Sequence, residues 1–317
     1  MKPDWAGDDL LSRLVNAAIG FKPLYALMKV GAKHVLQSTA EQNGVPWRAT
    51  VRQLQNTPEI QEIRAELENP KVEYPDYYVQ PFHAYEEGNL NWLAAFEVES
   101  ATYSMALRTF PDQGLSPAQA QQRLRDGIHG ALRDFQRRHS ARALEDAVDI
   151  GCSAGVSSRF LAAEFPNAQV IGVDLSPHFL AVAEWRERTE PRPGRRRVRY
   201  RHAPMEATSL ASGCADVVAA SFVIHECRPG AIRALIAEAR RLLRPCGVLL
   251  LADNNPRSKT IQNLPPALFT LMKSTEPWSD EYYQMDIEEA MREAGFLGVE
   301  TAEADHRHRA VLGLAPS

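Results

Sequence analysis

Short apolar runs and helix-like segments alternate from about residue 115 onward, and this alternation restricts the fold of the 317-residue chain more than any other feature. Strands are expected at residues 146–150, 169–173, 198–202, 216–221, 247–252, 297–304 and 307–314. Helices are expected at residues 117–139, 156–165, 230–243 and 286–294, and from Pro177 onward. Because parallel strands are usually joined by a helix, the order predicts an α/β fold with helices on both faces of a seven-stranded, mostly parallel sheet. The last strand is expected to be antiparallel.

The amino-terminal part, residues 1–115, has helix-like segments, proline-containing turns and few strand-like runs. We therefore expect a helical cap over residues 1–115 that covers a substrate, and a sheet domain over residues 116–317. Within the cap, residues 73–99 are rich in aromatic side chains: Tyr74, Tyr77, Tyr78, Phe82, His83, Tyr85, Trp92 and Phe96. These side chains either pack the cap against the sheet domain or line a substrate cavity, and different residues can do each.

An insertion at residues 254–283 follows the fifth expected strand. It is more apolar than a solvated loop, since it contains Leu264, Leu268, Phe269, Leu271 and Met272. Ligands of open α/β sheets bind at the carboxyl ends of the strands, so we expect this insertion to cover a pocket.

Charge and cysteine spacing exclude several classes of protein. The formal net charge of -4 gives no overall attraction to nucleic acid. None of the four cysteines belongs to a CxxC pair or has metal-ligand spacing to a histidine: Cys152, Cys214, Cys227 and Cys246. We therefore expect reduced thiols and no metal site.

The amino-terminal residues predict a soluble, intracellular protein with no transmembrane segment. The most apolar stretch, residues 14–36, is interrupted by lysines and a proline and is too polar to span a membrane. Aspartates stand where a signal peptide would be positively charged. The expected location is the cytoplasm, or a plastid if a transit peptide has been removed.

A glycine-containing turn, residues 149–155, follows the first expected strand and reads DIGCSAG. Glycines in such a turn let a ligand approach the backbone, and the following helix offers unpaired N–H groups at its amino terminus. Asp174 ends the second expected strand, where a carboxylate can accept hydrogen bonds from both ribose hydroxyls of a nucleoside. The order of strand, turn, helix, strand and acid therefore predicts a nucleoside site.

The turn differs from the dinucleotide fingerprint GxGxxG. Ser153 stands at the second glycine position and Val156 at the third. Because these glycines make room for a pyrophosphate and for close helix packing, a ligand without phosphates fits this turn better.

Residues 141–314 resemble class I S-adenosylmethionine-dependent methyltransferases, of the type-11 and type-12 kind, which have a Rossmann-like sheet. The resemblance rests on the turn at residues 149–155, on Asp174, and on residues 206–210 followed by residues 215–218. The amino-terminal part resembles uncharacterised plant and algal relatives. The resemblance implies that S-adenosyl-L-methionine is the cofactor and that its methyl group passes in line to an acceptor.

The resemblance also implies the cofactor contacts. The methionine part is expected beside the turn, the ribose at the end of the second strand, the adenine after the third, and the transferred methyl group at the end of the fourth. The residues at the turn are Asp149, Gly151, Cys152, Ser153 and Gly155, and those at the end of the second strand are Asp174 and Leu175. Those expected at the adenine are Met205 and Glu206, and those at the methyl group are Ser221 and Phe222. The aspartate that usually precedes the adenine-facing turn is missing from residues 202–205.

A general base assists methyl transfer to a hydroxyl or an acidic carbon, and the candidates follow the fourth and fifth strands. They are His225, Glu226 and Asp253. His225 is preferred because an ordinary histidine pKa of about 6.5 suits proton removal near neutral pH. Further candidates in the aromatic segment are His83 and Tyr85. Each of these residues also has a structural interpretation as a helix cap or ion-pair partner.

The sequence favours a small-molecule acceptor, with two alternatives. One is an RNA or protein methyltransferase, in which the amino-terminal helices recognise the macromolecule. Nucleic acid is the less favoured partner, because the arginine run at residues 192–201 lies in a connection away from the carboxyl edge of the sheet. The other is a cofactor-binding fold without catalysis. The sequence determines neither the acceptor atom nor the oligomeric state.

Overall fold

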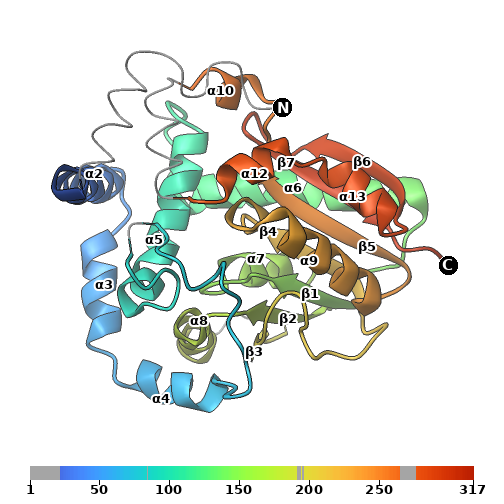
Figure 1. Ribbon diagram of the computed structural model, residues 1–317, viewed down its shortest axis with the longest axis horizontal. Coiled ribbons are helices and arrows are strands. Elements are labelled where there is room, and N and C mark those ends of the chain that lie inside the picture. The colour runs from blue at the N-terminus through green and yellow to red at the C-terminus, as the bar shows by residue number, and fades with distance from the viewer. Residues whose placement is uncertain (1–21, 84, 191–193, 195, 265–275) are drawn as a thin grey trace.

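The computed structural model describes residues 22–83, 85–190, 194, 196–264 and 276–317. Its centre is a seven-stranded sheet with the strand order β3-β2-β1-β4-β5-β7-β6 (Figure 1). The parallel strands are β1 (Asp146–Ile150), β2 (Gln169–Asp174), β3 (Arg199–His202), β4 (Ala215–Ser221) and β5 (Leu243–Asn254). β7 (His308–Leu314) runs antiparallel to β5 and to β6 (Leu297–Glu303). The predicted mostly parallel, seven-stranded Rossmann-like sheet is confirmed.

Helices cover both faces of the sheet, because alternate strand residues point to opposite sides and both sides are apolar. In β1, Val148 and Ile150 face one core and Ala147 faces the other. The first core is covered by α9 (Pro229–Leu242) and α13 (Ile287–Glu293). The second is covered by α6 (Pro117–His139), α7 (Val156–Glu164) and α8 (Pro177–Thr189).

The ends of β5 differ from the prediction. We expected a helix over residues 230–243 and a strand over residues 247–252. Instead α9 ends at Leu242 and β5 begins at Leu243, which pairs with Ala215 across a register shift. Tertiary pairing keeps this proline-containing stretch extended.

The amino-terminal helices pack against the sheet domain instead of standing apart from it. They are α2 (Lys22–Gln42), α3 (Trp47–Gln55), α4 (Glu59–Leu67) and α5 (Trp92–Thr109). Apolar residues of α3, α4 and α5 share one buried cluster with Phe179 and Val182 of α8. Between α4 and α5, residues 69–83 and 85–91, which we call the strap, form turns with an isolated bridge between Phe82 and Tyr85. The aromatic segment at residues 73–99 is therefore helical only from Trp92 onward.

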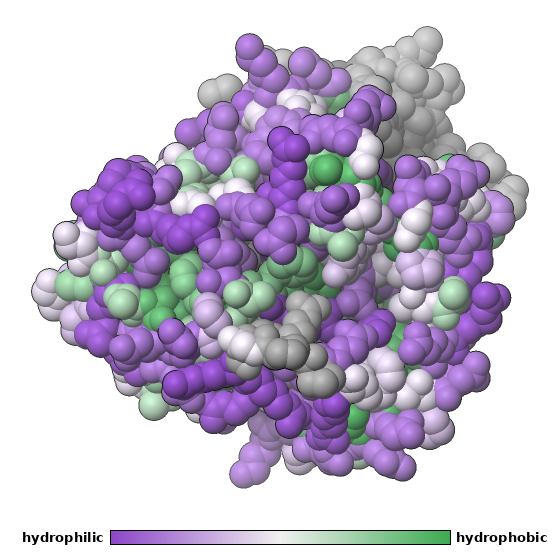
Figure 2. Space-filling view, turned by 180° about the vertical axis from the view of Figure 1, so that it is seen from behind, coloured by the Kyte–Doolittle hydropathy of each residue, from purple (hydrophilic) through white to green (hydrophobic). Residues whose placement is uncertain are grey.

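Shorter elements complete the fold: η1 (Ile224–Glu226), α10 (Lys259–Gln262) and α12 (Ser279–Gln284). In the insertion, Leu264 packs against the core beside α9, whereas residues 268, 269, 271 and 272 lie outside the described residues. No helix in the described part of the chain is both long and apolar enough to cross a membrane. The face opposite to the one in Figure 1 is mostly hydrophilic, with smaller hydrophobic patches (Figure 2).

Candidate functional site

The turn between β1 and α7 has the left-handed backbone that its glycines allow. The φ angles are +67° at Gly151, +51° at Ser153 and +76° at Gly155. A Cβ atom added at Gly155 would lie 2.2 Å from the hydroxyl of Tyr200, and one at Gly151 would lie 2.6 Å from a methyl group of Val223. Both glycines are therefore required by the protein's own packing. This is a second reason for glycine at these positions, besides the approach of a ligand to the backbone that the sequence indicated.

Asp174 lies beside this turn, as the sequence predicted. One carboxylate oxygen accepts a hydrogen bond from the Ser153 amide at 2.7 Å, and the other accepts one from the Ser176 amide at 2.8 Å. Burial raises the pKa of Asp174 to about 6, although these backbone hydrogen bonds oppose the shift. The carboxylate is thus ionised at neutral pH, and each oxygen keeps a lone pair for a further donor.

Asp149 and Cys152 are buried beneath the turn. Asp149 accepts hydrogen bonds from the hydroxyls of Ser157 and Ser158, both at 2.6 Å, and so holds the first turn of α7. Cys152 packs in the core beside α7 and α8, and burial raises the pKa of its thiol. These two residues position the turn, and both of their side chains are buried.

Several buried polar atoms at the carboxyl edge have no hydrogen-bond partner among the described residues. They are Oγ of Ser153, Oε2 of Glu206, Nε of Arg125, and both amide atoms of Gln121. Unpaired buried polar groups are costly, so native proteins rarely leave several of them together. A polar ligand with both donors and acceptors would satisfy these atoms. The residues present therefore fit a nucleoside that carries an amino-acid tail.

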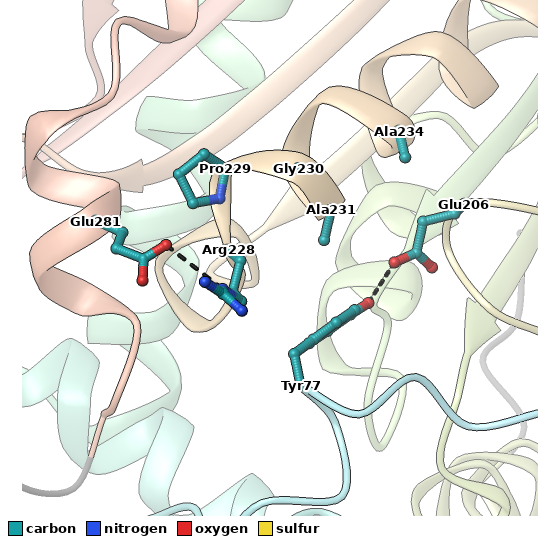
Figure 3. A pocket seen from close by; sticks show the side chains of 8 residues that line it. All are labelled: Tyr77, Glu206, Arg228, Pro229, Gly230, Ala231, Ala234 and Glu281. Atoms are coloured by element: carbon teal, nitrogen blue, oxygen red, sulfur yellow. Dashed lines mark hydrogen bonds and ion pairs between the residues drawn. The ribbon is translucent and has the colours of Figure 1, made fainter.

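The residues expected at the adenine lie after β3. Met205 is buried, with its sulfur 4.0 Å from Cys227 Sγ, and Glu206 accepts a hydrogen bond from the Tyr77 hydroxyl. Glu206 forms part of the wall of an open cavity of about 600 Å³ at the amino terminus of α9 (Figure 3). The cavity is lined by Tyr77, Glu206, Arg228, Pro229, Gly230, Ala231, Ala234 and Glu281.

The strap lies across the carboxyl ends of three strands. The Asn69 amide donates to His202 Nδ1 at 2.9 Å, and His202 Nε2 lies 3.0 Å from the carbonyl oxygen of Leu175. The Ser176 hydroxyl donates to the carbonyl oxygen of Asn89 at 2.7 Å. Leu175 therefore acts through its backbone, in a contact between β2, β3 and the strap. The aromatic composition indicated a covering role for this segment, but the pattern gave no sign of these partners.

Glu226 fastens the strap to the end of β4. His83 Nε2 lies 2.9 Å from one of its carboxylate oxygens, and the Asn89 side-chain amide donates to the other at 3.3 Å. With both oxygens engaged, Glu226 is better placed to position the strap than to take a proton. Tyr85 lies apart from this cluster, since its hydroxyl donates to Glu97.

His225 forms a buried pair with Asp253 across the ends of β4 and β5. Nδ1 of His225 lies 2.8 Å from Asp253 Oδ1, and the ring of Tyr282 packs edge-on at 6.5 Å between centroids. Burial alone would lower the pKa of His225, but the charge of Asp253 and the hydrogen bond to it raise the pKa to about 10. His225 is therefore a cation at neutral pH. The expectation of a general base assumed the ordinary histidine pKa, which His225 does not have in this structure.

Ser221 is the last residue of β4, and Phe222 follows it. Ser221 pairs with Ala252, and the Phe222 amide donates to the Ala252 carbonyl at 2.8 Å. Phe222 has φ +59°, and its ring lies 5.0 Å from the ring of His308 between centroids. Within the arginine run, Arg197 pairs with Glu184, Arg199 and Arg201 lie in β3, and residues 192 and 195 lie outside the described part of the chain.

No group of three or more histidine, cysteine, aspartate or glutamate side chains with metal-ligand geometry occurs among the described residues. The expected absence of a metal site stays a prediction.

Comparison with known proteins gives a family match and distant relatives. Residues 147–247 match the family model described as a methyltransferase domain. A malonyl-[acyl-carrier protein] O-methyltransferase of Laribacter hongkongensis is 30% identical over 211 residues, which cover 64% of this chain and 62% of that protein. The chain thus covers less than two thirds of this relative. An uncharacterized methyltransferase of Synechocystis sp. is 27% identical over 156 residues, covering 49% of this chain and 68% of that protein.

Among solved structures, a phosphoethanolamine N-methyltransferase 2 of Haemonchus contortus in complex with S-adenosyl-L-methionine is 18% identical to the chain. The superposition has a TM-score of 0.49 and covers 77% of this chain and 61% of that chain.

Proposed function

Since the chain carries a class I S-adenosylmethionine-dependent methyltransferase domain, we propose that it transfers the methyl group of this cofactor to a small-molecule acceptor. The observation that carries the proposal is the ionised carboxylate of Asp174 beside the turn between β1 and α7, where Ser153 Oγ has no hydrogen-bond partner among the described residues. These groups belong to different elements, yet they meet at the edge where α/β sheets bind ligands.

The chain's own residues would hold the cofactor in three places. Asp174 would accept hydrogen bonds from the ribose hydroxyls, and Glu206 with Tyr77 would border the adenine. The backbone of residues 151–155 would lie against the amino-acid part. When bound, the cofactor supplies an electrophilic methyl group on a sulfonium.

His225 is the group we place on the acceptor side. Asp253 holds Nδ1, so Nε2 carries a proton that can be donated to an acceptor oxygen. His225 is buried and the ring of Tyr282 packs edge-on against it, and a charge-assisted hydrogen bond gains strength in such surroundings. In this role His225 fixes the position of the acceptor atom, and positioning contributes a large part of the rate in displacement reactions.

His225 Nε2 can donate a hydrogen bond to an ionised acceptor oxygen, such as that of a carboxylate, if this oxygen takes the place beside Nε2 where Glu226 Oε1 now lies at 4.0 Å. An ionised oxygen needs no general base, and the imidazolium would orient it. The name of one relative, malonyl-[acyl-carrier protein] O-methyltransferase, refers to a derivative of a carboxylic acid. A neutral hydroxyl acceptor would require His225 to lose its proton first, which its raised pKa opposes.

Calorimetry with S-adenosylhomocysteine tests the proposal. We expect micromolar binding, which corresponds to about -8 kcal/mol. Asp174→Ala should weaken binding by about 1 to 3 kcal/mol, because charge-assisted hydrogen bonds to the ribose are lost. Asp134→Ala, which changes a 58% exposed aspartate on α6, is the matched control and should bind like the wild type. Absence of binding to the wild-type protein would contradict the proposal.

A further inference from the structure

Two arginines at the start of β7 have buried nitrogen atoms that the proposed chemistry has not used. Arg309 is 3% exposed, and Arg307, two residues before it, is partly buried. Nε and Nη2 of Arg309 and Nε of Arg307 have no hydrogen-bond partner among the described residues. Unpaired buried polar groups are costly, so a ligand that accepts hydrogen bonds from these nitrogen atoms would stabilise the protein.

The two guanidinium groups lie on the same side of the sheet. The pairing between β5 and β7 continues to Arg307, whose carbonyl oxygen accepts a hydrogen bond from the Asn255 amide at 2.8 Å. Side chains two residues apart on a paired strand project to the same face, and the next in this series, Val311, belongs to the core beneath α9 and α13. Burial and nearby carboxylates raise the pKa of Tyr283 on α12, whereas the charges of both arginines oppose this rise. Both guanidinium groups therefore lie near this phenol.

The same face carries His225, the group that the proposed function places at the acceptor. Arg309 pairs with Asp253 across β5 and β7, and Asp253 holds His225 Nδ1 at 2.8 Å. In α12, which lies next to β7 (Figure 1), the centre of the Tyr282 ring is 5.9 Å from the guanidinium carbon of Arg309. The same ring is 6.5 Å from the His225 imidazole between centroids. Arg309 and His225 thus lie beside one phenol ring, at the edge where α/β sheets bind ligands.

Two carboxylates approach these cations, and both have other partners. Glu288 Oε2 lies 3.5 Å from Nη1 of Arg309, while Oε1 accepts a hydrogen bond from the Thr301 hydroxyl at 2.7 Å. Asp253 is engaged by His225. The three unpaired nitrogen atoms of the arginines therefore need a partner from outside the chain. A guanidinium group matches a carboxylate or a phosphate, because it can donate two parallel hydrogen bonds to either.

We propose that Arg307 and Arg309 bind a second anionic group of the acceptor, besides the ionised oxygen that His225 orients. This inference rests on the proposed function, and it narrows the acceptor to a molecule with two carboxylates, or with one carboxylate and one phosphate. The arginines hold the group that does not react, and so place the reacting oxygen beside His225 Nε2. An acceptor with a single anionic group leaves the guanidinium groups unpaired and is rejected for that reason.

Pairs of probes that differ in one anionic group test the proposal by calorimetry, on the protein saturated with S-adenosylhomocysteine. Succinate, glutarate and adipate are each compared with the monocarboxylate of the same chain length. At least one dicarboxylate should bind about 10-fold more tightly than its monocarboxylate. Arg307→Met should remove this preference by weakening the dicarboxylate alone, and Arg309→Lys should reduce it. Arg292→Met, at a 52% exposed position on α13, is the matched control and should keep it.

A structural role of the arginines gives a different result from a binding role. If Arg307→Met weakened both members of a pair equally, or neither, the proposal would be overturned. The absence of any dicarboxylate preference in the wild type would overturn it as well. Arg307→Met should keep the wild-type melting temperature and affinity for S-adenosylhomocysteine, because β1, β4 and β5 lie between β7 and β2. It therefore decides the question even if Arg309→Lys fails to fold.

A phosphonate probe identifies the second anionic group. In 3-phosphonopropionate, a phosphonate replaces one carboxylate of succinate. Tighter binding than succinate assigns the arginines to a phosphate, and weaker binding assigns them to a carboxylate. Either order supports the proposal only if Arg307→Met removes the preference over propionate. If the wild-type protein did not bind S-adenosylhomocysteine at all, the proposed function itself would fail, which is a distinct result.

Discussion

The two halves of the site are built in different ways. On the β1 and β2 side, Asp174 is held by the backbone amides of Ser153 and Ser176, in turns that follow directly from the strands. On the β4 and β5 side, His225 is held by the side chain of Asp253, and Glu226 by side chains of the strap. The first half thus depends on local backbone geometry, and the second on pairs of side chains from distant parts of the chain.

This difference matches what each half is proposed to bind. A fixed backbone suits a ligand that is the same in every turnover and in every member of a family. Side-chain pairs can be exchanged without changing the turn geometry, so the β4 and β5 side is free to adapt to a particular acceptor. Three changes test this contrast, in order of the expected effect.

Asp253→Asn should have the largest effect, because it removes one partner of a buried ion pair. The expected loss of stability is about 3 kcal/mol at pH 7. The pKa of His225 should fall from about 10, since Asp253 contributes most to its rise, although Glu276 and Glu226 would still oppose the effect of burial. The stability that the pair contributes is complete below pH 6.5 and is lost as the pH rises toward 10, so only the wild type should lose it across this range. Urea unfolding at several pH values and NMR titration of the imidazole measure both effects.

Asp134→Asn is the control for this change, since that aspartate is exposed. If the variant kept the high pKa of His225, the cation would not be a product of this pair. The contrast between the two halves would then lose its clearest example.

Gly155→Ala tests the backbone side and should cost about 2 to 3 kcal/mol of stability, through the left-handed φ and the overlap with Tyr200. Gly31→Ala is the control, because a Cβ atom there meets nothing within 4 Å and the residue lies in a helix. Tyr200→Phe in the Gly155→Ala background should recover part of the loss, because it removes the nearest atom. If urea unfolding showed no recovery in the double variant, the Tyr200 hydroxyl would not be the reason for glycine, which would leave the φ angle and the contacts with the Tyr200 ring and Ala183.

The pH dependence of cofactor binding should show the smallest effect. Asp174 has a pKa of about 6 and must be ionised to accept two hydroxyl groups. The affinity for S-adenosylhomocysteine should therefore be constant above pH 7 and about tenfold lower at pH 5, because only the ionised fraction binds. Calorimetry across this range should give a flat profile for Asp174→Asn. The same pH profile in that variant would assign the titration to another group.

Much of the fold followed from the sequence, and the reason is local. The limits of α6 and β1 agree with the expected ranges, since capping residues and apolar periodicity lie within the elements themselves. β5 is the exception, because its first residues are held by pairing with β4 despite a proline. The position of Asp174 beside the turn was also predictable, since parallel strands bring their carboxyl ends to one edge.

The sequence by itself determined the sheet, the turn and the acid at the end of β2, because each depends on residues that are close together in the chain. Only the tertiary structure decided that His225 is a cation, that Glu226 holds the strap, and that Arg125 is buried without a partner. Charge states and partners of side chains depend on what surrounds them after folding. Those surroundings come from Asp253, His83 and Phe222, which lie on elements that no local pattern connects.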